Sequence, residues 1–212
     1  MTKAIIFDFD GVLCLSELPR FNALRTICTN HGLDLLDDHV PQVAGKTTVK
    51  ALEHLFPECD PEIMARILKD FRTSYIGQIE KHVEPVALTV DFIKSYTGST
   101  RFAVASMSSM ESLEKLLTHF GIRDKISVII SRNEVTHHKP DPEVYLKALE
   151  LLQLPAHECV AIEDTALGAT AAIAAGLPCY VLLNGFNTPA DFPEDVMVAG
   201  YIETSEDIKS IF

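Results

Sequence analysis

The chain has 212 residues, of which 47% are hydrophobic and 23% are charged, and its formal net charge is −12. This is ordinary globular composition, and the length suits one large domain or one domain with a smaller companion. The acidic balance argues against a general nucleic-acid binder, which needs a basic surface. It leaves room for a small anionic substrate, because a bound divalent cation can reverse the local field.

The N-terminal residues show no recognisable signal region, and no apolar stretch approaches the length of a membrane span. Five cysteines are widely spaced along the chain: Cys14, Cys28, Cys59, Cys159 and Cys179. Their odd number and spacing predict reduced core residues rather than a disulfide framework or a zinc site. We therefore expect a cytoplasmic protein with neither a membrane nor a nucleic acid as partner, and the oligomeric state stays open.

The first predicted element is a buried strand over residues 4–7, which leads into Asp8, Asp10 and Gly11. Side chains two residues apart in a strand point the same way, so two negative charges crowd at its carboxyl end. Such crowding is unfavourable unless a cation binds there or one carboxyl group is protonated for a task. The segment favours a reactive site at a sheet edge, although a strand followed by an Asp-Gly turn is the simpler alternative.

Residues 15–82 carry a helical pattern and no convincing strand. Apolar side chains recur at helical spacing over residues 18–28, in a helix that is expected to end at Gly32, and again over residues 63–75. We expect an all-helical domain over residues 15–82, inserted after the first strand. The core domain then consists of residues 1–14 and 83–212.

The remainder of the chain alternates between strands and helices. Continuous apolar runs predict strands at 102–105, 128–130, 159–162 and 180–183, and helical spacing predicts helices at about 86–97, 110–119, 142–153 and 166–175. Continuous apolar runs are typical of parallel strands covered on both faces. The pattern predicts an α/β fold with a doubly wound, Rossmann-like parallel sheet and right-handed crossovers.

Further polar groups follow the predicted strands: Ser106, Lys139, Glu163 and Asp164. Because the carboxyl ends of parallel strands meet at one edge of a sheet, these groups can converge with the two aspartates of the first strand on a single site.

Each of these groups also has a simpler interpretation. Ser106 could be a helix cap, Lys139 a solvated loop lysine, and Glu163 with Asp164 an acidic turn before a helix. The adjacent His137 and His138 are expected only to solvate the loop before Lys139. Because these groups all follow successive strand ends, one shared site explains them better than an independent structural role for each.

In this order, the motifs resemble those of the haloacid dehalogenase-like hydrolase superfamily, and the resemblance spans nearly the entire chain. Residues 8–12 resemble the first motif, Ser106 the second, Lys139 the third, and Glu163 and Asp164 with the following Gly168 the fourth. The helical insertion resembles the family's α-helical cap, as in its β-phosphoglucomutase and sugar-phosphate phosphatase branch.

The resemblance implies phosphoryl transfer. Asp8 would attack phosphorus and form an aspartyl phosphate, and Asp10 would act as general acid and then general base. Ser106 and the backbone N–H of Met107 would hold the phosphoryl oxygens, whose charge Lys139 would neutralise.

The resemblance also implies a Mg²⁺ cofactor. Asp8, the backbone carbonyl of Asp10 and Asp164 would bind the ion, which prefers oxygen ligands. Glu163 would be either a direct ligand or a residue that contacts the ligands.

The segment after the first motif departs from the pattern of these relatives. Residues 15–17 read Leu-Ser-Glu where Asp-Ser-Glu is frequent, and Arg20 stands where the sugar-phosphate mutases carry a histidine. These mutases also carry an arginine three residues after a cap glycine, whereas here Gly45 is followed by Lys46, Thr47 and Thr48. The candidate substrate contacts are Glu17, Arg20, Gly45 and Lys46. For Arg20, Lys46 and the nearby Lys50, the simpler alternative is that they are exposed charges on a helix surface.

Three hypotheses about function follow. The first is a Mg²⁺-dependent phosphatase of a small phosphorylated metabolite, such as a sugar phosphate. The second is an intramolecular phosphotransferase resembling β-phosphoglucomutase, which the departures after the first motif weaken. The third is a non-catalytic regulatory protein on the same scaffold, which the intact Asp8, Asp10, Lys139 and Asp164 argue against. The substrate itself is not readable from the sequence.

Overall fold

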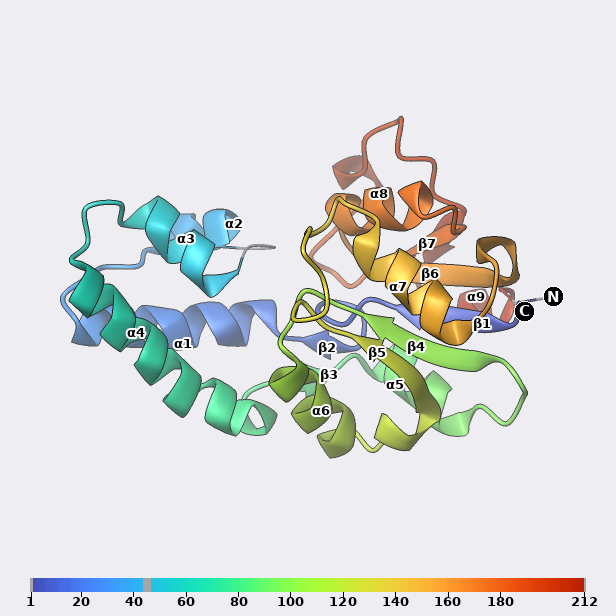
Figure 1. Cartoon of the computed structure of the whole chain (residues 1–212), viewed down its shortest axis with the longest axis horizontal. Coiled ribbons are helices and arrows are strands. Elements are labelled where there is room, and N and C mark those ends of the chain that lie inside the picture. The colour runs from blue at the N-terminus through green and yellow to red at the C-terminus, as the bar shows by residue number, and fades with distance from the viewer. Residues whose placement is uncertain (1, 44–46, 212) are drawn as a thin grey trace. The chain divides into compact units, whose positions relative to one another are not determined.

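The computed structural model describes residues 2–43 and 47–211, and the chain divides into two compact units (Figure 1). The α/β unit consists of Met1–Cys14 and Pro85–Phe212, and the helical unit of Leu15–Glu84. The helical unit extends two residues past the expected boundary at residue 82, because the chain returns through strand β3 (Glu84–Pro85). This strand forms a separate two-stranded sheet with β2 (Cys14–Leu15) where the chain passes between the units.

A six-stranded parallel sheet forms the centre of the α/β unit. Its strands are β1 (Ala4–Phe7), β4 (Arg101–Ala105), β5 (Ile126–Ile130), β6 (Cys159–Glu163), β7 (Cys179–Leu182) and β8 (Gly200–Ile202). Their order is β5-β4-β1-β6-β7-β8, and every neighbouring pair is parallel. The doubly wound sheet predicted from the sequence is therefore confirmed. Its strand order reverses at β1, which is where open α/β sheets bind ligands.

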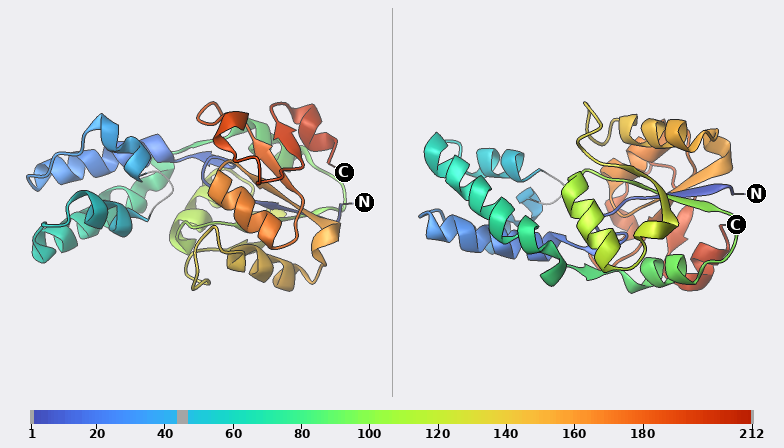
Figure 2. Two further views of the ribbon diagram at one scale, coloured as in Figure 1. Left: turned by 90° about the horizontal axis from the view of Figure 1, so that it is seen from above. Right: turned by 60° about the horizontal axis from the view of Figure 1, so that its bottom comes forward.

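Helices cover both faces of this sheet (Figures 1 and 2). The connecting elements are α5 (Ala87–Ser95), α6 (Met110–His119), η3 (Arg123–Lys125), α7 (Glu143–Leu152), η4 (Ala156–Glu158), α8 (Ala166–Ala174), η5 (Pro189–Asp191) and α9 (Ser205–Lys209), where η denotes a 3₁₀ helix. Helix α7 packs on β4 and β5 and contacts α8, whereas α5 contacts α9 on the opposite face. Their apolar faces bury the sheet, so only the edges are left for polar chemistry.

The sequence missed the last strand and helix, β8 and α9. In β8 only Ile202 is fully buried, and in α9 only Ile208 is. Such short segments carry too few apolar residues to show a periodicity, so tertiary packing alone defines them.

The helical unit contains two long helices and several shorter ones. They are α1 (Glu17–Asn30), η1 (Asp37–His39), α2 (Val40–Val43), α3 (Thr48–Leu55), α4 (Pro61–Ser74) and η2 (Ile76–Lys81). Helix α1 packs against α4, and the His31 ring nitrogen Nε2 lies 2.8 Å from Asp70 Oδ2 across that contact. Helix α4 begins with Asp60 as its cap, whose side chain accepts from the backbone of Glu62.

All five cysteines are free thiols, and every one except Cys59 is buried. The prediction of core cysteines is therefore confirmed for four of them, whereas Cys59 is only partly buried. Across residues 2–43 and 47–211, no helix is long and apolar enough to span a membrane.

The position of β1 in the middle of the sheet makes a stability prediction. Ile6 is fully buried, so Ile6→Ala is expected to lower the free energy of unfolding by about 2–5 kcal/mol in denaturant titrations. Leu151→Ala is the matched control, because Leu151 is 61% exposed on α7, and its effect should stay within about 0.5 kcal/mol. Equal effects of the two substitutions would contradict the central position of β1.

Candidate active site

The two aspartates stand in a turn at the carboxyl end of β1. The backbone N–H of Asp8 donates to the Ile162 carbonyl at 2.8 Å, and Leu13 donates to the Phe9 carbonyl at 2.8 Å. Gly11 has a φ of +81°, and a Cβ at this position would lie 1.8 Å from Asp164 Oδ2. The Asp-Gly turn considered in the sequence analysis is therefore present. It also brings the backbone of Gly11 close to the carboxylate of Asp164, which follows β6.

Lys139 is buried among acidic groups rather than solvated. Its Nζ donates to Asp8 Oδ1 at 2.8 Å, to Glu163 Oε1 at 2.6 Å and to the Ala105 carbonyl at 3.1 Å. These contacts engage all three N–H donors of the ammonium group. The side chain is 8% exposed, so the alternative of a solvated loop lysine is wrong.

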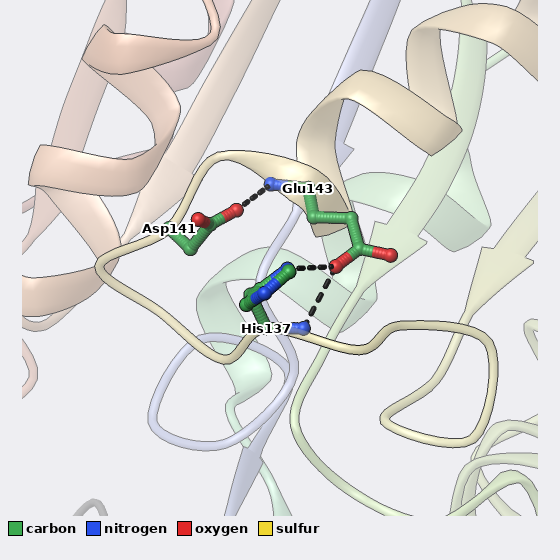
Figure 3. A group of neighbouring side chains, drawn as sticks. All are labelled: His137, Asp141 and Glu143. Atoms are coloured by element: carbon green, nitrogen blue, oxygen red, sulfur yellow. Dashed lines mark hydrogen bonds and ion pairs between the residues drawn. The ribbon is translucent and has the colours of Figure 1, made fainter.

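The loop that carries Lys139 is braced by Glu143 at the start of α7 (Figure 3). The Glu143 carboxylate accepts from the backbone N–H of His137 at 2.7 Å and of Thr136 at 3.0 Å, and Lys147 Nζ lies 3.0 Å away. Asp141 Oδ1 accepts from the Glu143 N–H at 2.9 Å, as a helix cap does.

His137, Asp141 and Glu143 are close enough to hold a metal ion. However, their carboxylates already accept these N–H groups, and the exposed His137 ring lies against Glu143 Oε2 at 3.1 Å. The arrangement is therefore a brace for the loop, in which His137 also takes part.

Glu163 is fully buried at the end of β6. Its Oε1 accepts from Tyr145 Oη at 2.6 Å as well as from Lys139, and its Oε2 accepts from the Asp164 N–H at 3.2 Å. A Cβ on Gly168 would lie 2.0 Å from Oε1, so this glycine makes room for the carboxylate. The cap of α8 is Thr165, and the alternative of a simple acidic turn is therefore wrong for Glu163.

Two serines after β4 contact Asp10. Ser106 is fully buried, its Oγ lies 3.4 Å from Asp10 Oδ2, and it accepts from the Ser108 N–H at 2.9 Å. Ser108 Oγ donates to the same Asp10 oxygen at 2.7 Å. The cap of α6 is Ser109, so the helix-cap alternative for Ser106 is wrong. Met107 is partly buried against the core, and its predicted contact with phosphate stays a prediction.

These contacts place several buried acidic groups around one ammonium group. Burial and the nearby Glu163 raise the pKa of Asp8 to about 7, and burial with Asp8 and Glu163 raises the pKa of Asp164 well above its ordinary value. Burial by itself would lower the pKa of Lys139, but Asp8 and Glu163 hold it above its ordinary value, so it stays charged. The site therefore carries an excess of carboxylates that favours a bound cation.

The acidic residues fit a divalent cation. Oxygens of Asp8, Glu163 and Asp164 lie within 4.8 Å of one another. Asp164 Oδ1 is buried and has no hydrogen-bond partner among the residues that the structure describes. Both oxygens of Glu163 already accept hydrogen bonds, from Lys139, Tyr145 and the Asp164 N–H, whereas Asp164 Oδ1 accepts none among the described residues, so Asp164 is better suited than Glu163 to direct ligation.

The predicted substrate contacts at Glu17 and Arg20 belong to the helical unit. Arg20 Nη2 donates to Glu17 Oε2 and to the Val43 carbonyl, both at 2.9 Å. The Arg20 side chain is only 16% exposed, so the alternative of an exposed charge is wrong for it, whereas Lys50 is exposed. Gly45 and Lys46 lie outside the described residues.

Sequence reasoning missed four polar residues near the site: Ser108, Tyr145, Asn184 and Asn187. Asn184 follows a predicted strand, as the other site residues do, and Ser108 lies beside Ser106. Their positions after strand ends were therefore a usable signal. Tyr145 lies within an apolar helix face, and no local pattern marks it.

The chain is similar in sequence to one protein family and to several known phosphatases. A family model described as haloacid dehalogenase-like hydrolase matches residues 5–182. The fructose-1-phosphate phosphatase YqaB of Escherichia coli K12 is 29% identical over 177 residues, covering 82% of this chain and 92% of that protein. The phosphorylated carbohydrates phosphatase of Thermotoga maritima is 27% identical over 179 residues, covering 82% of each.

Among solved structures, CbbY from Rhodobacter sphaeroides in complex with phosphate superimposes with a TM-score of 0.83. Its sequence is 24% identical, and the match covers 98% of this chain and 96% of that one. At this identity the likeness establishes the fold.

The brace at Glu143 predicts a pH-dependent stability. The N–H of His137, Lys147 and the N–H of Thr136 lower the pKa of Glu143 from 4.5 to about 2. A folded-state pKa below the unfolded value contributes stability above about pH 4.5, which is lost as the pH falls towards 2. Glu143→Gln should therefore lower the Tm at neutral pH, and its difference from the parent protein should shrink below pH 4.5.

The matched control for this prediction is Glu150→Gln, an exposed position on the same helix. It should change the Tm little at any pH. A Glu143→Gln deficit that stays constant down to about pH 2 would contradict the role of the charge.

Proposed function

Because the chain belongs to the haloacid dehalogenase-like hydrolase family, we propose that it is a metal-dependent phosphatase acting on a small phosphorylated metabolite. The observation that carries the proposal is the buried Asp8–Lys139 pair with Asp10 two residues further on, at the carboxyl edge of β1. The matched relatives named as phosphatases of fructose 1-phosphate and of phosphorylated carbohydrates support sugar phosphates as the substrate class.

In the proposed reaction, a carboxylate oxygen of Asp8 attacks phosphorus and the bond to the leaving oxygen breaks, with Asp10 protonating that oxygen. Asp10 then takes a proton from water, whose oxygen attacks the aspartyl phosphate. The P–O bond to Asp8 breaks, which releases phosphate and restores both carboxyl groups. The Ser108 hydroxyl supports this role of Asp10 because its hydrogen bond orients the carboxylate.

Lys139 and Ser106 are assigned to the phosphoryl group. Lys139 holds Asp8 in place and offsets the negative charge that two anions bring together. Ser106 and the backbone N–H of Met107 follow β4 directly and are proposed to donate to phosphoryl oxygens.

The cation is assigned to Asp8, Asp164 and the backbone carbonyl of Asp10, with Glu163 as a neighbour that holds Lys139. An all-oxygen donor set of this kind suits Mg²⁺. When bound, the ion would neutralise part of the charge on the carboxylates and on the transferring group.

The helical unit is assigned to substrate selection, as the resemblance to capped members of the family implies. Glu17 and Arg20 belong to this unit, and we propose that they contact the substrate. Their hydrogen bonds to each other and to Val43 fix the orientation of the Arg20 guanidinium, which a specificity residue requires.

The nucleophile assignment predicts a loss of turnover. Asp8→Asn should abolish phosphate release, and Asp10→Asn should lower kcat by about 10²–10⁴-fold because proton transfer is lost. Rapid-quench labelling with a ³²P-phosphorylated substrate should show covalent label on the parent protein and none on Asp8→Asn.

Asp91→Asn on α5 is the matched control, since it makes the same chemical change at an exposed position. It should retain full activity. Unchanged turnover of Asp8→Asn would falsify the nucleophile assignment.

The comparison with a mutase gives a separate prediction. With a panel of sugar phosphates and Mg²⁺, the protein should release inorganic phosphate without any bisphosphate primer. The measurement is kcat/KM for phosphate release beside product analysis by NMR. Isomerised sugar phosphate without phosphate release would instead identify the intramolecular phosphotransferase.

A further inference from the structure

The loop between β7 and η5 places two asparagine side chains against the acidic site. Asn184 Nδ2 donates to the Gly11 carbonyl at 2.9 Å and to Asp164 Oδ2 at 3.1 Å. This one amide group thus joins the turn after β1 to the carboxylate after β6. Both contacts lie within the α/β unit.

Asn187 completes this asparagine clasp, by which we mean Asn184 and Asn187 together. Its Nδ2 donates to the Asp164 carbonyl at 2.7 Å and to the Leu182 carbonyl at 2.9 Å. Its Oδ1 accepts from the Asn184 N–H at 3.1 Å, which fixes the backbone that carries the other asparagine. The clasp therefore holds both the backbone and the side chain of Asp164.

The two carboxylate oxygens of Asp164 differ in their hydrogen bonding. Oδ2 accepts from Asn184, whereas Oδ1 is buried without a hydrogen-bond partner among the described residues. A carboxylate held by one oxygen cannot rotate freely, so its other oxygen has a set direction.

The asparagines themselves are not suited to be ligands. The Asn184 Oδ1 atom accepts from the Phe186 N–H at 3.0 Å, and its Nδ2 donates to the two partners named above. An amide nitrogen does not ligate a hard cation, and the amide oxygen is engaged inside its own loop.

We propose that Asn184 and Asn187 are positioning residues that orient Asp164 towards a divalent cation. The inference rests on the proposed function, which assigns Asp164 to the metal. It adds that metal affinity depends on a loop outside all four sequence motifs.

The experiment measures metal binding directly on the full chain. Metal-free protein is titrated with Mg²⁺ by calorimetry and with Mn²⁺ by electron paramagnetic resonance, for the parent protein and Asn184→Ala. Loss of the hydrogen bond to a ligand carboxylate is expected to raise the Kd by about 10- to 100-fold. At saturating Mg²⁺, kcat should return to within a few fold, and the KM for a sugar phosphate should not change.

Two further variants keep the test decisive. Phe186→Ala is the matched control, because it removes a 67% exposed ring from the same loop and leaves both amides in place. It should bind metal like the parent protein. Asn184→Ser is used if Asn184→Ala does not fold, as judged by circular dichroism in EDTA, and it should show the same loss of affinity.

The outcomes separate the two proposals. A parent protein that binds neither ion and hydrolyses sugar phosphates in EDTA would contradict the proposed metal dependence itself. A parent protein that binds Mg²⁺, with a folded Asn184 variant whose Kd lies within twofold of it, would overturn only the role of the clasp. A loss of kcat at saturating metal with unchanged Kd would overturn it as well.

Discussion

The site depends on the ammonium group of Lys139 between two buried carboxylates. Ions removed from water lose several kcal/mol of hydration each, so they are stable only when they are paired and hydrogen-bonded. Lys139 satisfies this by donating to Asp8, Glu163 and the Ala105 carbonyl, which follow or end β1, β6 and β4. One side chain from the loop after β5 thereby connects three strand ends and allows acidic groups to share a buried space.

The acidic groups also need room, which two glycines provide. A Cβ on Gly11 would overlap the Asp164 carboxylate, and a Cβ on Gly168 would overlap that of Glu163. At Gly168 the constraint is the close approach of a side chain, and at Gly11 the left-handed φ of +81° adds to it. Beside Gly11, the asparagine clasp leaves Asp164 Oδ2 hydrogen-bonded to Asn184, while Asp164 Oδ1 has no hydrogen-bond partner among the described residues.

The acidic cluster and the hydrogen bonds of Arg20 lie in different units of the chain. All groups that the structure brings into the acidic cluster belong to the α/β unit, from Asp8 to Asn187. In the helical unit, Arg20 is engaged with Glu17 and the end of α2. The proposed reaction centre therefore lies within the α/β unit, and the proposed substrate contacts Glu17 and Arg20 lie within the helical unit.

Local sequence determined the parts of this protein that depend on near neighbours. The continuous apolar runs predicted the central parallel strands, and the run over residues 4–7 placed Asp8 and Asp10 at a strand end, because an apolar run and the residues that follow it are local features of the sequence. Tertiary structure alone decided which partner each polar group has. Lys139 lies 131 residues from Asp8, and Asn184 lies 173 residues from Gly11, so no local pattern encodes these pairs. The burial of Glu163 and the short β8 and α9 followed from packing for the same reason.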